Sequence, residues 1–285
     1  MCSVELYIIT FNLIHMKDKL FTGVFTDFVK SDDSHALVRH LVTDKELLNL
    51  ADWCYTISSS HGFWEQDWPS SRNMAMIVCE MSEVIEVYRR HPEKVSSGST
   101  SFEELFMRRL LSSEEVADGV TYGSTIDPDR IISFTDSIVP VYKSAYDEFL
   151  KGTPQEELAD VAIYILDLVG SKSLVINSCI GHPDQLSGGD PLLSTTGDLD
   201  VARVSPYVCR STYKAAFDAS HPTDCACEFY RILFGMDIPT SIRLGLALRF
   251  LEKWMMANSW DFIWHVKAKM LYNTSRGFRN GGKQF

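Results

Sequence analysis

The segment 153–169 constrains the fold most, because its later part would be apolar on nearly every side if it formed a helix. It begins with helix-start signals: Thr153 and Glu156 have capping-box spacing, and Pro154 suits the first helical position. A helix with so little polar surface must be surrounded by other helices, so we expect it at the centre of a bundle. The residues that make it apolar are Leu158, Val161, Ala162, Ile163, Ile165, Leu166, Leu168 and Val169.

Helical periodicity recurs along the chain and strand signals are poor, which predicts an all-α fold. We expect the first helix at about 44–61 and a second at 71–91, which Pro92 ends. Further helices are predicted at 102–111 and 136–150, and some helical character at 211–234. The stretch 240–269 reads as one or two apolar helices that end near 272–273.

Two acidic steps interrupt these apolar helices, Glu80-Met-Ser-Glu83 and Glu157-Leu-Ala-Asp160. Residues three apart lie on one helix face, so each step projects two carboxylates in one direction. Converging carboxylates are costly to bury without a cation, and hard divalent cations prefer oxygen ligands. A di-iron centre would use Glu-x-x-His steps, and neither step contains histidine, which favours Mg²⁺ or Mn²⁺. The alternative, a solvent-facing acidic edge, stays open at this point.

The run from Lys267 to Lys283 combines cations, amide and phenol donors, and glycines that permit close backbone approach. Such a set suits a polyphosphate, especially beside an acidic metal cage. A solubilising basic end is the alternative interpretation.

The loop 61–69 is unusually rich in aromatic residues. Phe63 and Trp64 could stack on a nucleobase, or they could anchor the loop to the core. For Trp68 we favour core anchoring.

Composition limits the function classes. A formal net charge of -11 argues against a nucleic-acid or membrane-surface binder, since both need a basic footprint. The seven cysteines are scattered without framework spacing, which favours a reducing compartment. The apolar start of the chain is too short to span a bilayer and has no basic leader region. We therefore expect a cytoplasmic protein, with organellar targeting left open.

Taken together, three blocks resemble the MazG-like, all-α nucleoside triphosphate pyrophosphohydrolases. The first is Gly62-Phe-Trp-Glu65 with Arg72-Asn73 and the stretch from Cys79 to Arg89, and it is similar to the family's first metal helix. The second, from Glu156 to Leu168, is similar to its second metal helix. The third, Lys269 to Arg276 with Asn280-Gly-Gly-Lys283, is similar to its phosphate-contacting block. The resemblance covers less than a third of the chain.

The resemblance implies a Mg²⁺-dependent enzyme that converts a nucleoside triphosphate to the monophosphate and pyrophosphate. Glu80, Glu83, Glu157 and Asp160 would bind the metal, with Glu80 or Glu83 also acting on the attacking water. Asp167 would be an additional or outer-shell ligand. The β- and γ-phosphates would be held by Lys269, Tyr272, Asn273, Arg276 and Lys283. A pyrimidine deoxynucleotide such as dUTP or dCTP is the preferred substrate, and a dimer or tetramer is expected.

The chain also departs from the family pattern. We interpret 1–285 as one domain with large insertions at about 92–153 and 170–239. Asn280 stands where the family commonly has a histidine, and Pro154 stands where a lysine is usual. The insertions leave a second hypothesis open, a catalytically quiet nucleotide-binding or scaffold protein.

Overall fold

The computed structural model describes residues 3–32, 42–64, 70–95, 101–113, 134–171, 220–235 and 240–276. Apart from turns and one short 3₁₀ segment (Pro92–Lys94), every regular element in these ranges is an α-helix, which confirms the all-α prediction. The helices are α1 (Ser3–Asp32), α2 (Asp44–Ser60), α3 (Ser70–Arg90), α4 (Phe102–Leu111), α6 (Ile138–Phe149), α7 (Pro154–Ser171), α9 (Pro222–Phe234), α10 (Thr240–Ala257) and α11 (Phe262–Thr274). None of the helices in the described ranges combines the length and apolar character needed to cross a membrane.

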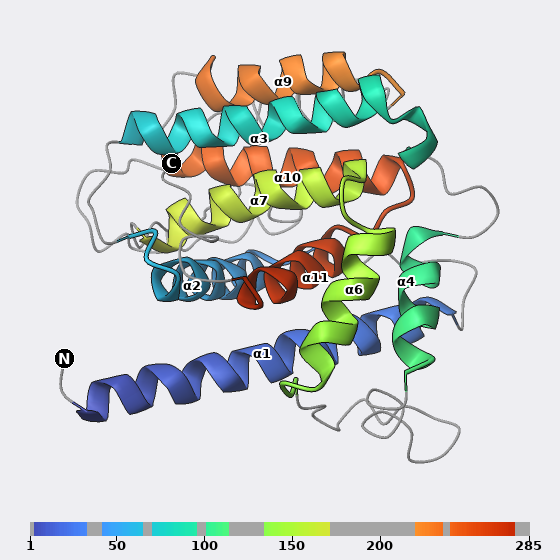
Figure 1. Ribbon diagram of the computed structural model, residues 1–285. Coiled ribbons are helices and arrows are strands. Elements are labelled where there is room, and N and C mark those ends of the chain that lie inside the picture. The colour runs from blue at the N-terminus through green and yellow to red at the C-terminus, as the bar shows by residue number, and fades with distance from the viewer. Residues whose placement is uncertain are drawn as a thin grey trace, which may run out of the picture.

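Helix α7 lies at the centre of the bundle, as its apolar sequence predicts. It packs against α2, α3, α10 and α11, and α3 in turn carries α9 on its outer side (Figure 1). Leu158, Val161 and Leu166 on α7 are fully buried. The central position matters for function, because any polar residue on α7 is held between neighbouring helices.

Local signals explain where several helices begin. The Thr43 hydroxyl accepts a hydrogen bond from the Glu46 amide, and the Glu46 carboxylate accepts one from the Thr43 amide, so a capping box starts α2. Asp261 caps α11 by accepting from the Trp264 amide at 2.8 Å. At the start of α7, the Thr153 hydroxyl accepts from the Glu156 amide at 3.3 Å.

The prediction that the first helix lies at 44–61 was wrong, because α1 precedes it. Met16, Leu20 and Val24 follow each other at four-residue spacing and are buried. This side of α1 packs on α11, where the Trp264 indole N–H donates to the Val24 carbonyl at 3.0 Å. Lys267 of α11 forms an ion pair with Asp27 at 2.6 Å.

The segment 92–153, interpreted from the sequence as an insertion, contributes to the same core. Phe106 of α4 is fully buried and contacts Tyr142 of α6 edge-to-face, with ring centroids 5.3 Å apart. The Phe106 ring also lies 5.7 Å from that of Trp264 on α11. Of the second presumed insertion, the structure describes only 170–171 and 220–235, where α9 packs on α10 and α3.

Candidate metal centre

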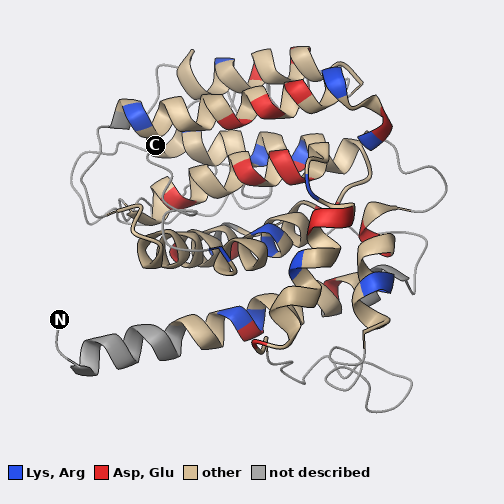
Figure 2. Ribbon diagram, viewed as in Figure 1, with Lys and Arg blue, Asp and Glu red and all other residues tan. Residues whose placement is uncertain are grey.

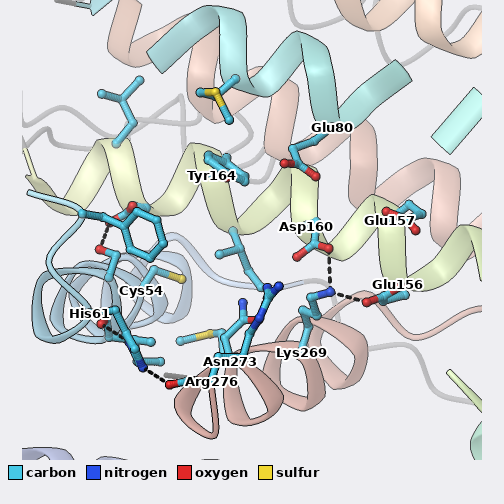
Figure 3. Close-up of a pocket in the computed structure, with 18 of the residues that line it drawn as sticks. Cys54, His61, Glu80, Glu156, Glu157, Asp160, Tyr164, Lys269, Asn273 and Arg276 are labelled. Carbon is cyan, nitrogen blue, oxygen red and sulfur yellow. Dashed lines mark hydrogen bonds and ion pairs between the residues drawn. The ribbon is translucent and has the colours of Figure 1, made fainter. Parts of the chain in front are cut away.

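A pocket of about 410 Å³ opens between α2, α3, α7 and α11 (Figure 3). Acidic residues of both α3 and α7 line it, and Figure 2 shows the acidic positions on these two neighbouring helices. All four acids predicted as metal ligands line this pocket, and so do Lys269, Asn273 and Arg276. The three blocks that are far apart in the sequence therefore come together at one site.

Three of the four acids form a tight cluster. Glu80 from α3 and Glu157 and Asp160 from α7 each offer a carboxylate oxygen, and these atoms all lie within 4.8 Å of one another (Figure 3). Glu157 and Asp160 are one turn apart on α7, and α3 supplies the third carboxylate by packing against that turn. An oxygen-only set of this kind fits Mg²⁺ or Mn²⁺, which take carboxylate ligands.

The electrostatics of the cluster favour a bound cation. Burial, together with the neighbouring charges of Asp160 and Glu83, raises the pKa of Glu80 to about 8, against the opposing effects of Lys269 and a Tyr164 hydrogen bond. Burial and the charges of Glu156 and Asp160 raise the pKa of Glu157 to about 9. Burial also raises the pKa of Asp160, to about 6, with Lys269 acting in the opposite direction. A divalent cation would relieve this repulsion.

Glu83 stands apart from the cluster. It lines the pocket from α3 but is exposed, and it is not among the carboxylates that converge within 4.8 Å. In this arrangement it offers a free carboxylate at the rim, within electrostatic reach of Glu80 and Glu157.

Lys269 does not present its ammonium to an open phosphate site. The side chain is 4% exposed, and its ammonium is paired with Glu156 and with Asp160, the latter at 2.6 Å (Figure 3). These anions raise the pKa of Lys269 although burial lowers it. The sequence indicated Glu156 only as a helix-start residue. Its second role depends on α11 lying beside α7, which no local pattern reports.

Of the remaining residues predicted in the C-terminal block, some line the pocket and others do not. Asn273 and Arg276 line the pocket, and the positive charge of Arg276 acts to lower the pKa of Asp160. Tyr272, predicted as a phosphate ligand, lies outside the pocket lining: it is buried, and its hydroxyl donates to Asp147 at 2.8 Å. Lys283 lies outside the described residues. Lys151, which the sequence analysis did not single out, joins the pocket from the turn between α6 and α7.

The other end of the pocket is aromatic. The Trp64 indole N–H lies 2.9 Å from both Ser58 Oγ and Asp167 Oδ1, and the Ser58 hydroxyl donates to the same Asp167 oxygen at 2.6 Å. Burial raises the pKa of Asp167 to about 7. Phe63 also lines this end. Trp68 lies outside the described residues.

Asp167 is therefore placed differently from the predicted outer-shell ligand. It stands two helical turns beyond Asp160, about 10 Å along α7, and is engaged with Trp64 and Ser58. Beside it, the two ring nitrogens of His61 lie 2.8 Å from the Ile57 and Arg276 carbonyl oxygens, which ties the end of α2 to the end of α11 (Figure 3). The sequence analysis missed this tie, because neither partner of His61 is a side chain.

Comparisons of the chain with protein-family models, with curated proteins and with solved structures found no match.

Proposed function

We propose that this protein is a Mg²⁺-dependent nucleoside triphosphate pyrophosphohydrolase of the MazG-like, all-α kind, which releases a nucleoside monophosphate and pyrophosphate. The observation that carries the proposal is the cluster of Glu80, Glu157 and Asp160 at one end of a pocket with an aromatic other end. A ligand with a metal-bound polyphosphate and a flat base matches both ends. House-cleaning of the nucleotide pool is the proposed role.

At the acidic end, Glu80, Glu157 and Asp160 would hold Mg²⁺. Bound Mg²⁺ supplies charge neutralisation at the phosphoryl oxygens and a lowered pKa for water. Glu83 is the carboxylate that the cluster does not use, so it is the candidate to orient the attacking water and take its proton. Attack at the α-phosphorus would then release pyrophosphate.

The phosphates would lie along the cationic side of the pocket. Arg276, Asn273 and Lys151 line it and carry N–H donors suited to phosphate oxygens. Lys269 would influence the metal site indirectly, because its ammonium is paired with Asp160, one of the proposed metal ligands. The base would lie beside Trp64 and Phe63 at the aromatic end.

The size of the pocket supports a small-molecule substrate. A volume of about 410 Å³ falls in the lower part of the usual range for ligand sites, roughly 300–1,000 Å³. Within the proposal, a pyrimidine deoxynucleotide such as dUTP or dCTP is the preferred substrate. The proposal also includes assembly into a dimer or tetramer, as the family resemblance implies, and a cytoplasmic location, which the scattered cysteines favour.

Product analysis tests the proposed reaction. The protein is incubated with a panel of deoxy- and ribonucleoside triphosphates in Mg²⁺ and in EDTA, and the products are separated by ion exchange. We expect monophosphate and pyrophosphate in Mg²⁺ only. Glu80→Gln should lower turnover at least ~10²-fold. Glu86→Gln is the matched control, because Glu86 lies on the same helix but pairs with Arg89 and Arg90. Diphosphate with orthophosphate would contradict the proposal.

One observation favours a second candidate, a catalytically quiet nucleotide-binding or scaffold protein. The ion pair between Lys269 and Asp160 already compensates part of the acidic charge from within the chain. A scaffold of this kind needs no metal, so Mg²⁺ should not raise its melting temperature, whereas binding to the native metal centre should.

A further inference from the structure

The ammonium of Lys269 occupies a position that is built for a cation. Glu156 and Asp160 are its ion-pair partners, and the rings of Tyr146 and Tyr272 face it with their centroids 5.9 and 5.6 Å away. Aromatic rings at this distance attract a cation through their negative faces. Two carboxylates and two rings together enclose a side chain that is 4% exposed.

Three of the four walls of this enclosure, Tyr146, Tyr272 and Glu156, have a further contact of their own. The Tyr146 and Tyr272 rings are stacked with centroids 4.3 Å apart, and the Tyr272 hydroxyl donates to Asp147. The Glu156 carboxylate accepts from the Gly152 amide at 2.6 Å. Because Tyr272 and Glu156 are held by partners other than Lys269, the ammonium position does not depend on the Lys269 rotamer alone.

Asp160 belongs to this enclosure and to the metal cluster at the same time. Its carboxylate contacts Lys269 at 2.6 Å and also lies within 4.8 Å of the Glu80 and Glu157 oxygens. A second divalent cation between Asp160 and Glu156 would have to displace the ammonium or sit against it. Like charges at such a distance in a poorly hydrated site repel strongly. The side of Asp160 that faces Glu80 and Glu157 remains for a metal.

We infer that Lys269 is the built-in second cation of the carboxylate cluster, so that the nucleotide-free protein takes up one divalent cation per chain. This inference rests on the metal centre of the proposed function. It departs from the sequence-based expectation that Lys269 contacts phosphate, and it makes Lys269 a positioning residue that acts through Asp160.

The test is a count of Mn²⁺ ions bound per chain without nucleotide, by calorimetric titration and by electron paramagnetic resonance of free Mn²⁺. We expect one ion for the unmodified protein and two for Lys269→Met, because Glu156 and Asp160 then lose their cation. Lys267→Met is the matched control: Lys267 lies on the same helix but pairs with Asp27 of α1, so its removal should leave the count at one.

A second variant keeps the test valid if Lys269→Met fails to fold, which its circular dichroism would reveal. In Glu156→Gln the Lys269 ammonium loses one charged partner, so Asp160 becomes its only carboxylate partner. Mn²⁺ should then bind about tenfold more weakly, the factor expected when one charge-assisted hydrogen bond is redistributed. Unchanged affinity in this variant would count against the inference.

The outcomes separate the inference from the proposed function. Two ions in the unmodified protein, or one ion at unchanged affinity in a folded Lys269→Met, would overturn the role of Lys269 and leave the metal-dependent enzyme standing. No bound Mn²⁺ in the unmodified protein would overturn both.

Discussion

At the scale of single residues, the raised pKa values of Glu80 and Glu157 mean that ionising these carboxyls costs the folded protein free energy. Both carboxyls lie against other acids and are shielded from water, so ionisation is unfavourable without a cation. Among the described residues, carboxylates converge in this way at the end of the pocket where α3 meets α7. A cost concentrated at a pocket is typical of a functional site.

The metal-free protein should therefore lose stability as the pH rises. Between about pH 5 and 8 the unfolded chain has lost the protons of Glu80 and Glu157, whereas the folded chain retains them. Because the unfolded state binds fewer protons, the free energy of unfolding falls by about 1.4 kcal/mol per pH unit for each retained proton, and so by up to about 2.7 kcal/mol per pH unit while both are retained. Asp147, with its pKa lowered to about 2, titrates below this window.

Thermal melts in EDTA across this pH range check the prediction. Mg²⁺ should remove most of the fall in melting temperature, and Glu80→Gln should flatten the curve in EDTA because one titrating group is gone. A melting temperature that rises steadily from pH 5 to 8 in EDTA would show that these carboxyls are not the groups that matter.

Site residues could be predicted from the sequence where short-range spacing along the chain indicates their role. The two acidic steps, Asn273 and Arg276 were found in that way, and the pocket brings them together. The partnership of Glu156 with Lys269 and that of Trp64 with Asp167 join residues about 100 positions apart. Such pairs depend on how the helices pack, so one sequence cannot report them.

At the scale of helices, α2 and α7, which both line the pocket, approach each other closely at Gly170. Gly170 on α7 lies so near α2 that an added Cβ would meet the Ala51 carbonyl oxygen at 2.4 Å and the Tyr55 Cβ at 2.8 Å. Backbone cannot yield as a flexible side chain does. The absence of a side chain at Gly170 is thus what permits this close approach.

Gly170→Ala should destabilise the protein by about 1–3 kcal/mol, the usual cost of overpacking. Gly23→Ala is the control, since its Cβ would meet only the end of the Lys267 side chain, at 3.3 Å, and alanine favours a helix. Urea unfolding of both variants measures the difference. Equal stability would mean that α2 and α7 can separate at little cost.

Helix positions were predicted better than helix partners. The predicted helix at 102–111 coincides with α4, and that at 71–91 differs from α3 by one residue at each end, because apolar periodicity and capping residues are local signals. α1 was missed although Met16, Leu20 and Val24 recur at helical spacing. Its charged residues, such as Lys17 and Asp18, interrupt the apolar pattern.

At the scale of the whole molecule, the segment 92–153, presumed from the sequence to be an insertion, is part of the same hydrophobic core as the other helices. The Phe106 ring lies among Tyr142, Tyr146 and Trp264, which join α4, α6 and α11. The last of these helices also carries Lys269 and Asn273 of the site. The segment therefore supports the metal centre through α11, and it could not be removed without loss of the core.

Phe106→Ala should lower the free energy of unfolding by about 3–5 kcal/mol, the cost of a large cavity in an aromatic core. Leu111→Ala on the same helix should change it by less than about 0.5 kcal/mol, because Leu111 is 37% exposed. Unfolding followed by circular dichroism should remain a single transition in both variants. A separate early transition in Phe106→Ala would indicate an independent insertion.

The most direct test of the central claim is the position of the attacked phosphorus. A substrate from the nucleotide panel is hydrolysed with Mg²⁺ in H₂¹⁸O, and the ¹⁸O content of each product is measured by mass spectrometry. Attack at the α-phosphorus predicts that the label enters the nucleoside monophosphate and that pyrophosphate stays unlabelled. Label in pyrophosphate, or turnover that Glu80→Gln does not reduce, would contradict the account of the acidic cluster as a pyrophosphohydrolase centre.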